Sequence, residues 1–437
     1  MTAETCTQPH VTEPRISVPA PGELPRLLPG GPGPVHLRAH LAGLGPPPYR
    51  GGAGLLIASA EAAGLTGRGG AAFPAHRKMA AVARAGRRAV VVGNGAEGEP
   101  ASSKDAVLLW QSPHFVLDGL QLAGEAVGAR SAVLYLHRHD GLRQHLQAAL
   151  AQRAAAGIDR ITAELIEAPP RFLSGEESAL VSLANGGPAR PRFKQPPVFQ
   201  KGIGGRPTLV QNVETLAHLA LIARLGAPWF RSLGTAQEPG SMLCSVTRAD
   251  GSRSVLEAAL GTRLDRVLAL GGRVQAVLCG GYHGAWLAAA TAARLSLRNA
   301  DLQPAGASVG AGLLAALPDD RCGLVETARV ARYLALESAG QCGPCRNGLP
   351  RIAAALAALA EPGADPRVLS DLRRWAGLVA SRGACRHPDG TVRFVRSALT
   401  VFATEIDRHI QGACSAASRA PFLPVPRETE IDESGWR

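Results

Sequence analysis

Apolar and polar residues follow two patterns along this chain. Between residues 51 and 235, short β-type runs such as AVVVGN at 89–94 and SAVLYLH at 131–137 alternate with longer helical segments, for example 113–129. Strands that alternate with helices of this length are typical of βαβ units and a largely parallel sheet. In such sheets ligands bind at the carboxyl ends of the strands. We therefore expect an α/β domain with a ligand site at one edge of its sheet.

The pattern changes after residue 240. MLCSVT, a DGS turn, SVLEAALG and VQAVLCGGY, followed by an Ala-rich helix, predict a small α+β domain over 240–320. Four helical runs then predict a bundle over 321–415, and the last of these, VRFVRSALTVFATEIDRHI, has the spacing of one long helix. The proline-rich residues 1–50 favour an irregular arm, and 416–437 a tail.

The composition supports a folded protein without a nucleic-acid partner. Apolar residues make up 46% and charged residues 19% of the 437 positions, as in globular chains. The net charge of +12 comes from scattered arginines, because only four of the 47 basic residues are lysines, and no run of like charges appears. Neither an apolar leader nor an 18-residue apolar run is present. We expect a cytoplasmic protein without a membrane span, associated with a membrane only through partner subunits.

Four polar segments lie in or beside the α/β region. GLTGRGGAAFPAHRK at 64–78 is a glycine-rich turn that could cradle an anionic ligand, although ligand-free turns of this kind are as common. NGAEGEP at 94–100 directly follows a predicted strand. FLSGEESAL at 172–180 places two glutamates where a helix start alone would favour them. GRPTLVQNVETLAHL at 205–219 offers side-chain amides, which suit a ribityl chain or a flavin edge.

Taken in order, with the PRFK after the GEE turn, these segments resemble the NADH-oxidising flavoprotein subunit of respiratory complex I, known in bacteria as the F-type subunit, and related flavin subunits of hydrogenases and formate dehydrogenases. The resemblance covers about residues 50–412. It implies a Rossmann-like FMN domain, a β-grasp-like soluble-ligand-binding domain and a helical iron–sulfur domain. It also implies a nucleotide loop formed by Gly67, Arg68, Gly69, Gly70, Phe73 and Lys78. FMN would be surrounded by Asn94, Glu97, Gly175, Glu176, Gln211 and Asn212, and the catalytic residues near the nicotinamide would be Glu99 and Glu177.

Several positions depart from the family pattern. The family usually has Asp at Ala96, Tyr at Phe172 and Cys at Ser174, and an aromatic residue at Ala81. Each lost aromatic stack should weaken nucleotide binding by about 1 kcal/mol. FMN binding is therefore expected to be better preserved than fast NADH turnover.

The cysteine motif ESAGQCGPCRNG at 337–348 resembles the cluster-binding motif of the family. Cys342, Cys345 and Cys385 match three ligands of a 4Fe-4S cluster, whereas the first ligand position is Ala339. Cys322 is a poor substitute, because an intervening helix would hold it about 20 Å from Cys342. The site could hold a cluster with another fourth ligand, a three-iron cluster, zinc or no metal.

Three functions follow from these motifs. The first is hydride transfer from NADH to FMN, with electrons passed singly to a cluster or to a partner, which the family implies is a small thioredoxin-like iron–sulfur subunit. The second is a degenerate FMN-binding relay or scaffold without NADH turnover. The third is a thiol-redox protein acting through Cys342-Gly-Pro-Cys345, which would require the motif to follow a strand.

Overall fold

The computed structural model describes residues 19–29, 33–86, 88–192, 196–427, 431, 435 and 436. Phe193 and Lys194 of the PRFK segment therefore lie outside the described residues. In the part of the chain that the structure describes, three helices precede the first strand, α1 (Leu37–Leu44), α2 (Ala53–Ala63) and α3 (Ala75–Ala85). Helix α1 lies in the segment predicted to be irregular, so that prediction is wrong for these residues. The segment is helical because Leu37, Leu41 and Leu44 recur with the i, i+4, i+7 spacing of a helix face.

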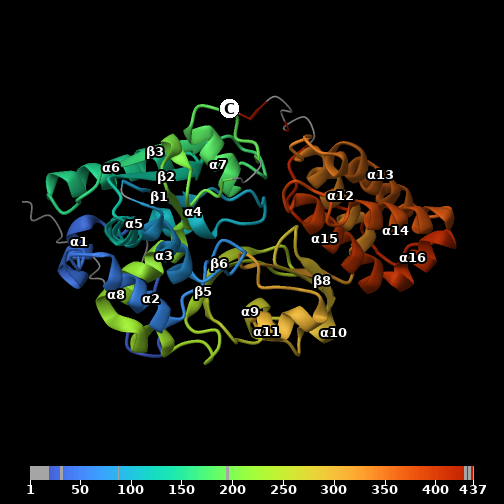
Figure 1. The fold of residues 1–437 in the computed structure, drawn as a ribbon. Coiled ribbons are helices and arrows are strands. Elements are labelled where there is room, and N and C mark those ends of the chain that lie inside the picture. The colour runs from blue at the N-terminus through green and yellow to red at the C-terminus, as the bar shows by residue number, and fades with distance from the viewer. Residues whose placement is uncertain are drawn as a thin grey trace, which may run out of the picture.

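The first sheet has four parallel strands in the order β3-β2-β1-β4 (Figure 1). Its strands are β1 (Val90–Gly95), β2 (Ser131–His137), β3 (Ala163–Ala168) and β4 (Thr208–Asn212). From β1 the chain proceeds to β2 and β3 on one side, whereas β4 joins β1 from the other side. The carboxyl ends of β1 and β4 therefore flank a topological switch point, where ligands bind in open α/β sheets.

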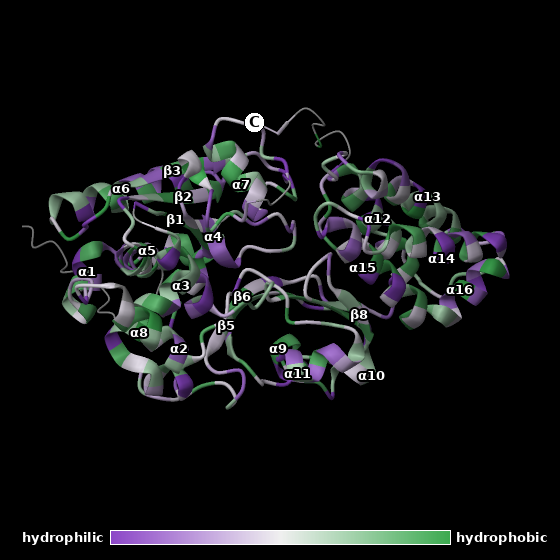
Figure 2. Ribbon diagram, in the orientation of Figure 1, coloured by the Kyte–Doolittle hydropathy of each residue, from purple (hydrophilic) through white to green (hydrophobic). Residues whose placement is uncertain are grey.

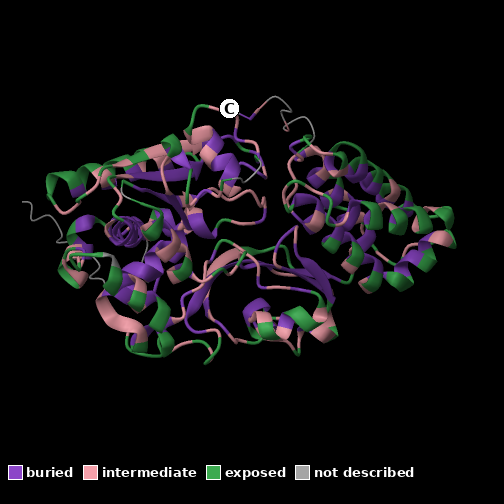
Figure 3. Ribbon diagram, viewed as in Figure 1, coloured by how far each residue is buried: buried purple, intermediate pink, exposed green. Residues whose placement is uncertain are grey.

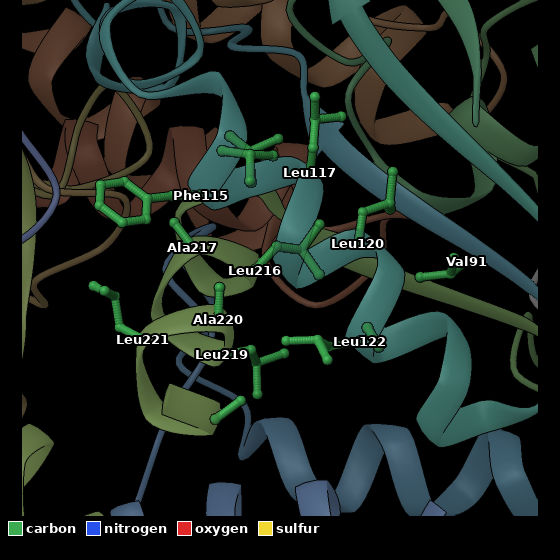
Figure 4. Packing of buried hydrophobic residues seen from close by; sticks show 14 of the residues in the cluster. Val91, Phe115, Leu117, Leu120, Leu122, Leu216, Ala217, Leu219, Ala220 and Leu221 are labelled. Atoms are coloured by element: carbon green, nitrogen blue, oxygen red, sulfur yellow. The ribbon is translucent and has the colours of Figure 1, made fainter. Parts of the chain in front are cut away.

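Helices cover both faces of this sheet. The connecting helices are α4 (Lys104–Gln111), α5 (Pro113–Val127), α6 (Leu142–Ala155), α7 (Glu177–Ala184) and α8 (Val213–Arg231), with a 3₁₀ turn at Ile203–Gly205. Leucine and alanine side chains of α5 and α8 form the centre of the core beside Val91 (Figure 4). A Cβ atom on Gly119 would lie 1.9 Å from the carbonyl oxygen of Leu216, so only glycine permits this close helix packing. Leu180 and Val198 pack on the opposite face.

The second sheet is mixed and has the order β6-β5-β9-β7-β8. Its strands are β5 (Ser241–Thr247), β6 (Arg253–Ala259), β7 (Val274–Cys279), β8 (Ala285–Ala288) and β9 (Leu313–Pro318), and only the β5–β9 pair is parallel. The short helices beside it are α9 (Leu264–Leu268), α10 (Ala289–Ala292), α11 (Asn299–Leu302) and a 3₁₀ turn at Gln303–Ala305. The predicted Ala-rich helix is partly wrong, because residues 285–288 pair with β7 and form β8. Pairing across a tight turn overrides the helix propensity of alanine.

The C-terminal part is helical. It contains α12 (Gly323–Leu336), a π-helical turn at Pro344–Gly348, α13 (Leu349–Leu359), α14 (Arg367–Val379), α15 (His387–Val401) and α16 (Ala403–Ile410). The single helix predicted over 392–410 is divided at Phe402, whose ring is buried against Trp286 of the second sheet. In Figures 2 and 3 the inner faces of these helices are more apolar and more buried than their outer faces.

The fold-class prediction is confirmed: an α/β part with a parallel sheet is followed by a smaller mixed sheet and a helical bundle. The strand order of the second sheet, with its first and last strands parallel in the centre, is that of a β-grasp sheet. Among the described residues, none of the helices is both long and apolar enough to span a membrane.

Candidate functional site at the switch point of the parallel sheet

The last residues of β1 and β4 lie side by side at the switch point. Asn94 pairs in register with Asn212, and Gly93 pairs with Gln211. The Asn212 amide nitrogen donates to the Asn94 carbonyl oxygen at 3.3 Å and to an oxygen of Asp105 at 2.6 Å, while the Asn212 side-chain oxygen accepts from the Glu214 amide and caps α8. The structure thus brings these two predicted FMN residues together at the sheet edge.

Gln211 has an unusual environment. Its side chain is only 4% exposed, yet its amide nitrogen is buried without a hydrogen-bond partner among the described residues. An unpaired buried amide costs about 1–3 kcal/mol of desolvation. A bound group that accepts a hydrogen bond here would remove this cost.

The loop after β1 carries Glu97, Gly98 and Glu99. Glu97 accepts from the Ser102 hydroxyl at 2.6 Å and from the Ala106 amide at 3.0 Å, so the first turn of α4 fixes this carboxylate. A Cβ on Gly98 would lie 2.0 Å from the Phe172 carbonyl oxygen. Glycine at this position therefore lets the loop after β1 approach the loop after β3.

Glu99 points towards the second sheet. Both of its carboxylate oxygens accept from the Tyr282 amide, at 3.1 and 3.0 Å, in the turn between β7 and β8. Burial raises the pKa of Glu99 to about 7, although the Tyr282 and His283 amides oppose this shift. Glu99 consequently changes protonation close to neutral pH, at the junction of the two sheets.

The two glutamates of the GEE turn have different environments. Glu176 accepts from the amides of Ser178 and Ala179, at 2.9 and 3.3 Å, and so caps α7, as the helix-start interpretation predicts. Glu177 is partly exposed and forms an ion pair with Lys78 at 2.8 Å. Gly175 lies beside the loop after β1, because its carbonyl oxygen accepts from the Asn94 side chain at 2.9 Å. Glu176 is thus used as a helix cap, whereas the Glu177 carboxylate pairs with a lysine from another segment.

The glycine loop lies between α2 and α3, against the start of α8. The Arg68 amide donates to the Thr215 hydroxyl at 2.9 Å, and a Cβ on Gly69 would lie 3.2 Å from the Asn212 Cβ. The Arg68 side chain is 4% exposed and bonds to Thr66 and to the Ser241 carbonyl oxygen, so its guanidinium connects the loop to the second sheet. Phe73, in contrast, exposes 49% of its surface and offers a ring on which a planar group can stack. Gly67 and Gly70 complete the turn, and the Gly67 amide donates to the Phe73 carbonyl oxygen.

A buried cluster of charged side chains lies next to Asn212 at the switch point. The Lys104 ammonium lies 2.7 Å from an oxygen of Asp105 and 2.8 Å from one of Glu214, and all three side chains are at most 5% exposed. Burial opposes ionisation of Glu214, but Lys104, His218 and Arg68 together hold its pKa at about 2. The cluster fixes Asp105, which in turn orients the Asn212 amide.

Sequence analysis missed His137 and the contact of Phe172 with the helical part. His137 ends β2; its Nδ1 lies 2.7 Å from the Glu97 carbonyl oxygen and its Nε2 lies 2.6 Å from the Ser174 hydroxyl. Burial lowers the pKa of His137 to about 4, so the neutral ring links the two loops. Its position at the carboxyl end of a predicted strand was the available signal. The Phe172 ring packs edge-on against Tyr333 of α12, and also against His283 in the turn between β7 and β8.

The structure brings the three predicted cluster cysteines together at the start of α13 and before α15. The Cys345 thiol interacts with both Cys342 and Cys385, and it is only 3% exposed. Ala339 is buried against Leu173 and Trp436. Beside it lies a cavity of 670 Å³ whose lining includes Cys345, Ala339, Trp436, Arg190 and Arg346.

The Cys-Gly-Pro-Cys motif follows helix α12 rather than a strand. Burial raises the pKa of the Cys345 thiol to about 12, and the neighbouring Cys342 adds to the shift. A reactive dithiol needs a lowered pKa, so this geometry does not favour a thioredoxin-like function.

Two family models match this chain. The Nuo51 FMN-binding domain matches residues 60–221, and the NADH-ubiquinone oxidoreductase-F iron–sulfur binding region matches 326–409. The second NADH-quinone oxidoreductase-F subunit of Rhizobium meliloti is 27% identical over 376 residues, which are 82% of this chain and 88% of that protein. The NADH-quinone oxidoreductase-F subunit of Streptomyces coelicolor is 28% identical over 399 residues, 87% of each chain.

Both matched regions of this chain are thus similar to those of NADH-quinone oxidoreductase-F subunits. NAD-reducing hydrogenase HoxS subunit alpha of Cupriavidus necator is 31% identical over 342 residues, 74% of this chain and 55% of that protein. The crystal structure of an NAD⁺-reducing [NiFe]-hydrogenase in the H₂-reduced state superposes with a TM-score of 0.75 at 31% identity and covers 82% of this chain. This chain spans 62% of that hydrogenase chain.

The matched regions confirm the predicted cofactors of this NADH-quinone oxidoreductase-F relative, which are FMN, NADH and an iron–sulfur cluster. The switch-point residues fit FMN, because the unpaired Gln211 amide lies where a flavin with several hydrogen-bond acceptors can meet it. The cluster region fits in part: three thiols are present, and the fourth ligand position is the methyl group of Ala339.

Proposed function

We propose that this chain is the FMN-containing subunit that oxidises NADH and passes the electrons, one at a time, to an iron–sulfur centre or a partner protein. The observation that carries this proposal is the arrangement of Asn94, Gln211 and Asn212 at the β1–β4 switch point, with one buried amide unpaired. The flavin, when bound, supplies the hydride-accepting ring and the change from two-electron to one-electron chemistry.

In this proposal the residues of the chain bind and orient the two ligands. The glycine loop and the exposed ring of Phe73 receive the nucleotide, and Lys78 supplies a positive charge next to it. Glu177 orients the nicotinamide from the start of α7. His137, which contacts the Glu97 carbonyl oxygen and the Ser174 hydroxyl, holds the loops after β1 and β3 together, so that the flavin ring is shielded from water on that side.

The acceptor is proposed to be a protein. The cluster cysteines and the cavity beside Ala339 lie in the helical part, and several arginines line that cavity. Such a surface suits an acidic electron-transfer protein, with a small thioredoxin-like iron–sulfur protein as the expected partner. Direct reduction of a quinone is not part of the proposal.

A second function, an FMN-binding relay without NADH turnover, is favoured by one specific feature. Ala339 replaces the first cluster ligand, and Trp436 packs against it, so the position is filled by apolar side chains. In that case the flavin would exchange electrons with a partner but not with NADH.

An anaerobic reduction experiment distinguishes the two functions. The full chain is purified without oxygen, its flavin is identified after release, and NADH is added while the visible flavin bands are recorded. We expect FMN whose bands bleach with NADH. FMN that stays oxidised with NADH but is bleached by dithionite would indicate the relay, and absence of flavin after reconstitution would contradict both.

A variant pair assigns the reduction to the site. Glu177→Ala should abolish bleaching by NADH while FMN stays bound, because the carboxylate that orients the nicotinamide is removed. The matched control is Glu164→Ala, which removes an exposed glutamate from β3. Equal reduction rates in both variants would contradict the nucleotide assignment.

A further inference from the structure

Four side chains at the end of the helical bundle converge away from the cluster cysteines and from the switch point. They are Cys322, Glu405, His409 and Cys414, and one ligand atom of each lies within 4.8 Å of the ligand atoms of the other three. Cys322 precedes α12, Glu405 and His409 lie in α16, and Cys414 follows α16. We propose that these residues form a closed, structural zinc site.

The distances match the edges of a zinc tetrahedron. The Cys322 sulfur lies 3.6 Å from His409 Nε2, and His409 Nε2 lies 3.3 Å from Glu405 Oε1. With zinc–sulfur bonds of about 2.3 Å and zinc–nitrogen or zinc–oxygen bonds of about 2.0–2.1 Å, the corresponding tetrahedral edges are about 3.5 and about 3.4 Å. These two pairs of ligand atoms therefore have the separation that one central ion requires, and the other pairs lie within 4.8 Å.

The surroundings orient the ligands as they do at metal sites. His409 Nδ1 lies 3.2 Å from the Leu359 carbonyl oxygen, so this nitrogen carries the proton and leaves Nε2 free to bind an ion. The Glu405 carboxylate accepts from the Ser415 amide at 2.8 Å and from the Ser415 hydroxyl at 2.5 Å. Glu405 and His409 are four residues apart and share one face of α16.

Burial and charge favour a bound cation over a cluster of free side chains. His409 is fully buried, Cys322 is 3% exposed and Glu405 is 9% exposed. Two thiolates and a carboxylate would place three negative charges around a divalent ion, and Arg419 interacts electrostatically with both cysteines. Two sulfurs, one imidazole and one carboxylate suit zinc, and four protein ligands leave no open position for catalysis.

This site is separate from the iron–sulfur motif. Its four ligands share no residue with the cluster cysteines Cys342, Cys345 and Cys385. The proposed ion joins the start of α12 to the end of α16, where Arg321 and Ser418 also form a bridge. It therefore closes the bundle that carries the cluster cysteines.

Zinc content and zinc coordination test the proposal. The full chain is produced in zinc-containing medium, purified anaerobically without chelator and analysed by elemental analysis and zinc-edge X-ray absorption. We expect about one zinc per chain with two sulfur and two nitrogen or oxygen ligands. Zinc bound by three sulfurs would assign the ion to the cluster motif and overturn the proposal, as would a zinc-free protein that takes up no added zinc.

Cysteine variants locate the ion, and a second measurement on the unaltered chain tests the site if those variants do not fold. Cys322→Ser and Cys414→Ser should each lose the zinc, while the control Cys342→Ser should retain it. If Cys322→Ser and Cys414→Ser do not fold, zinc is displaced by Co²⁺ in the unaltered chain. Thiolate-to-cobalt charge-transfer bands are then expected in the absorption spectrum. A disulfide between Cys322 and Cys414 in the anaerobically isolated chain, or zinc lost only from Cys342→Ser, would overturn the proposal.

Discussion

The Lys78 ammonium lies 2.8 Å from Glu177 Oε1, an ion pair that joins helix α3 to the first residue of α7. The two side chains come from the glycine loop region and from the GEE turn, which are about 100 residues apart in the chain. Both are partly exposed, so the pair itself contributes at most about 1 kcal/mol. Its importance is positional, because it places one positive and one negative group side by side where the glycine loop region meets the GEE turn.

Replacement of Lys78 should weaken nucleotide binding without changing the chemistry. Lys78→Met removes a positive charge that pairs with nucleotide phosphate in the ground state and the transition state alike, so KM for NADH should rise about 10-fold or more while kcat changes little. Steady-state kinetics with an artificial acceptor measure both constants. The control is Lys201→Met, an exposed lysine outside the site. A fall in kcat at unchanged KM for Lys78→Met would contradict this role.

Replacement of Gln211 should separate flavin binding from folding. Gln211→Leu removes the unpaired buried amide at nearly constant volume, so thermal stability should stay the same or rise slightly. The flavin would lose a hydrogen-bond donor, and its dissociation constant should rise about 10-fold. Fluorescence titration with FMN measures the affinity, and thermal unfolding without FMN measures the stability. Unchanged FMN affinity would mean that this amide does not contact the flavin.

Glu99 should make the stability of the protein depend on pH. Burial raises its pKa from 4.5 in the unfolded chain to about 7 in the folded protein. Between these two pH values the folded state retains a proton that the unfolded state has lost, so the free energy of unfolding should fall as the pH rises. The slope is at most about 1.4 kcal/mol per pH unit, and solvent access to Glu99 reduces it.

Glu99→Gln should remove this slope, because the amide cannot ionise. Chemical denaturation at intervals between pH 4.5 and 7 measures the free energy of unfolding. The control Glu125→Gln, on α5 and far from the junction of the sheets, should keep the wild-type slope. Parallel pH profiles for wild type and Glu99→Gln would contradict the assignment.

Ala339→Cys should restore the fourth cluster ligand. Ala339 is 9% exposed and lines the same cavity as Cys345, and it stands at the first ligand position of the cluster motif. We expect anaerobic reconstitution to give a more oxygen-stable cluster with about four irons per chain, measured by iron analysis and electron paramagnetic resonance. Ala339→Ser is the matched control. Equal iron content in Ala339→Cys and Ala339→Ser would show that a ligand other than residue 339 already completes the cluster.

The sequence predicted the parallel sheet well because its signals are local. The apolar runs that become β1 and β2 and the helical run that becomes α5 are continuous in the sequence, and the structure places them within one or two residues of the prediction. Strands β8 and β9 could not be predicted, since their alanine- and leucine-rich sequences become strands only through pairing with β7 and, for β9, also with β5.

The environment of the site residues depends on contacts between distant segments. That Glu99 binds the β7–β8 turn and that the Arg68 side chain contacts Ser241 could not be predicted from their own motifs. The convergence of Cys322 with Cys414 could not be predicted for the same reason, because the two cysteines are far apart in the sequence. The spacing of Glu405 and His409 was the one local sign of that site.

Binding of FMN at the β1–β4 switch point is the central claim, and its most direct test is a titration of the flavin-free full chain with FMN under anaerobic conditions. Quenching of flavin fluorescence reports the binding. We predict saturation at about one FMN per chain, with far weaker binding to Gln211→Leu. No saturable binding to the folded chain, or binding that is equally tight in Gln211→Leu, would contradict the account.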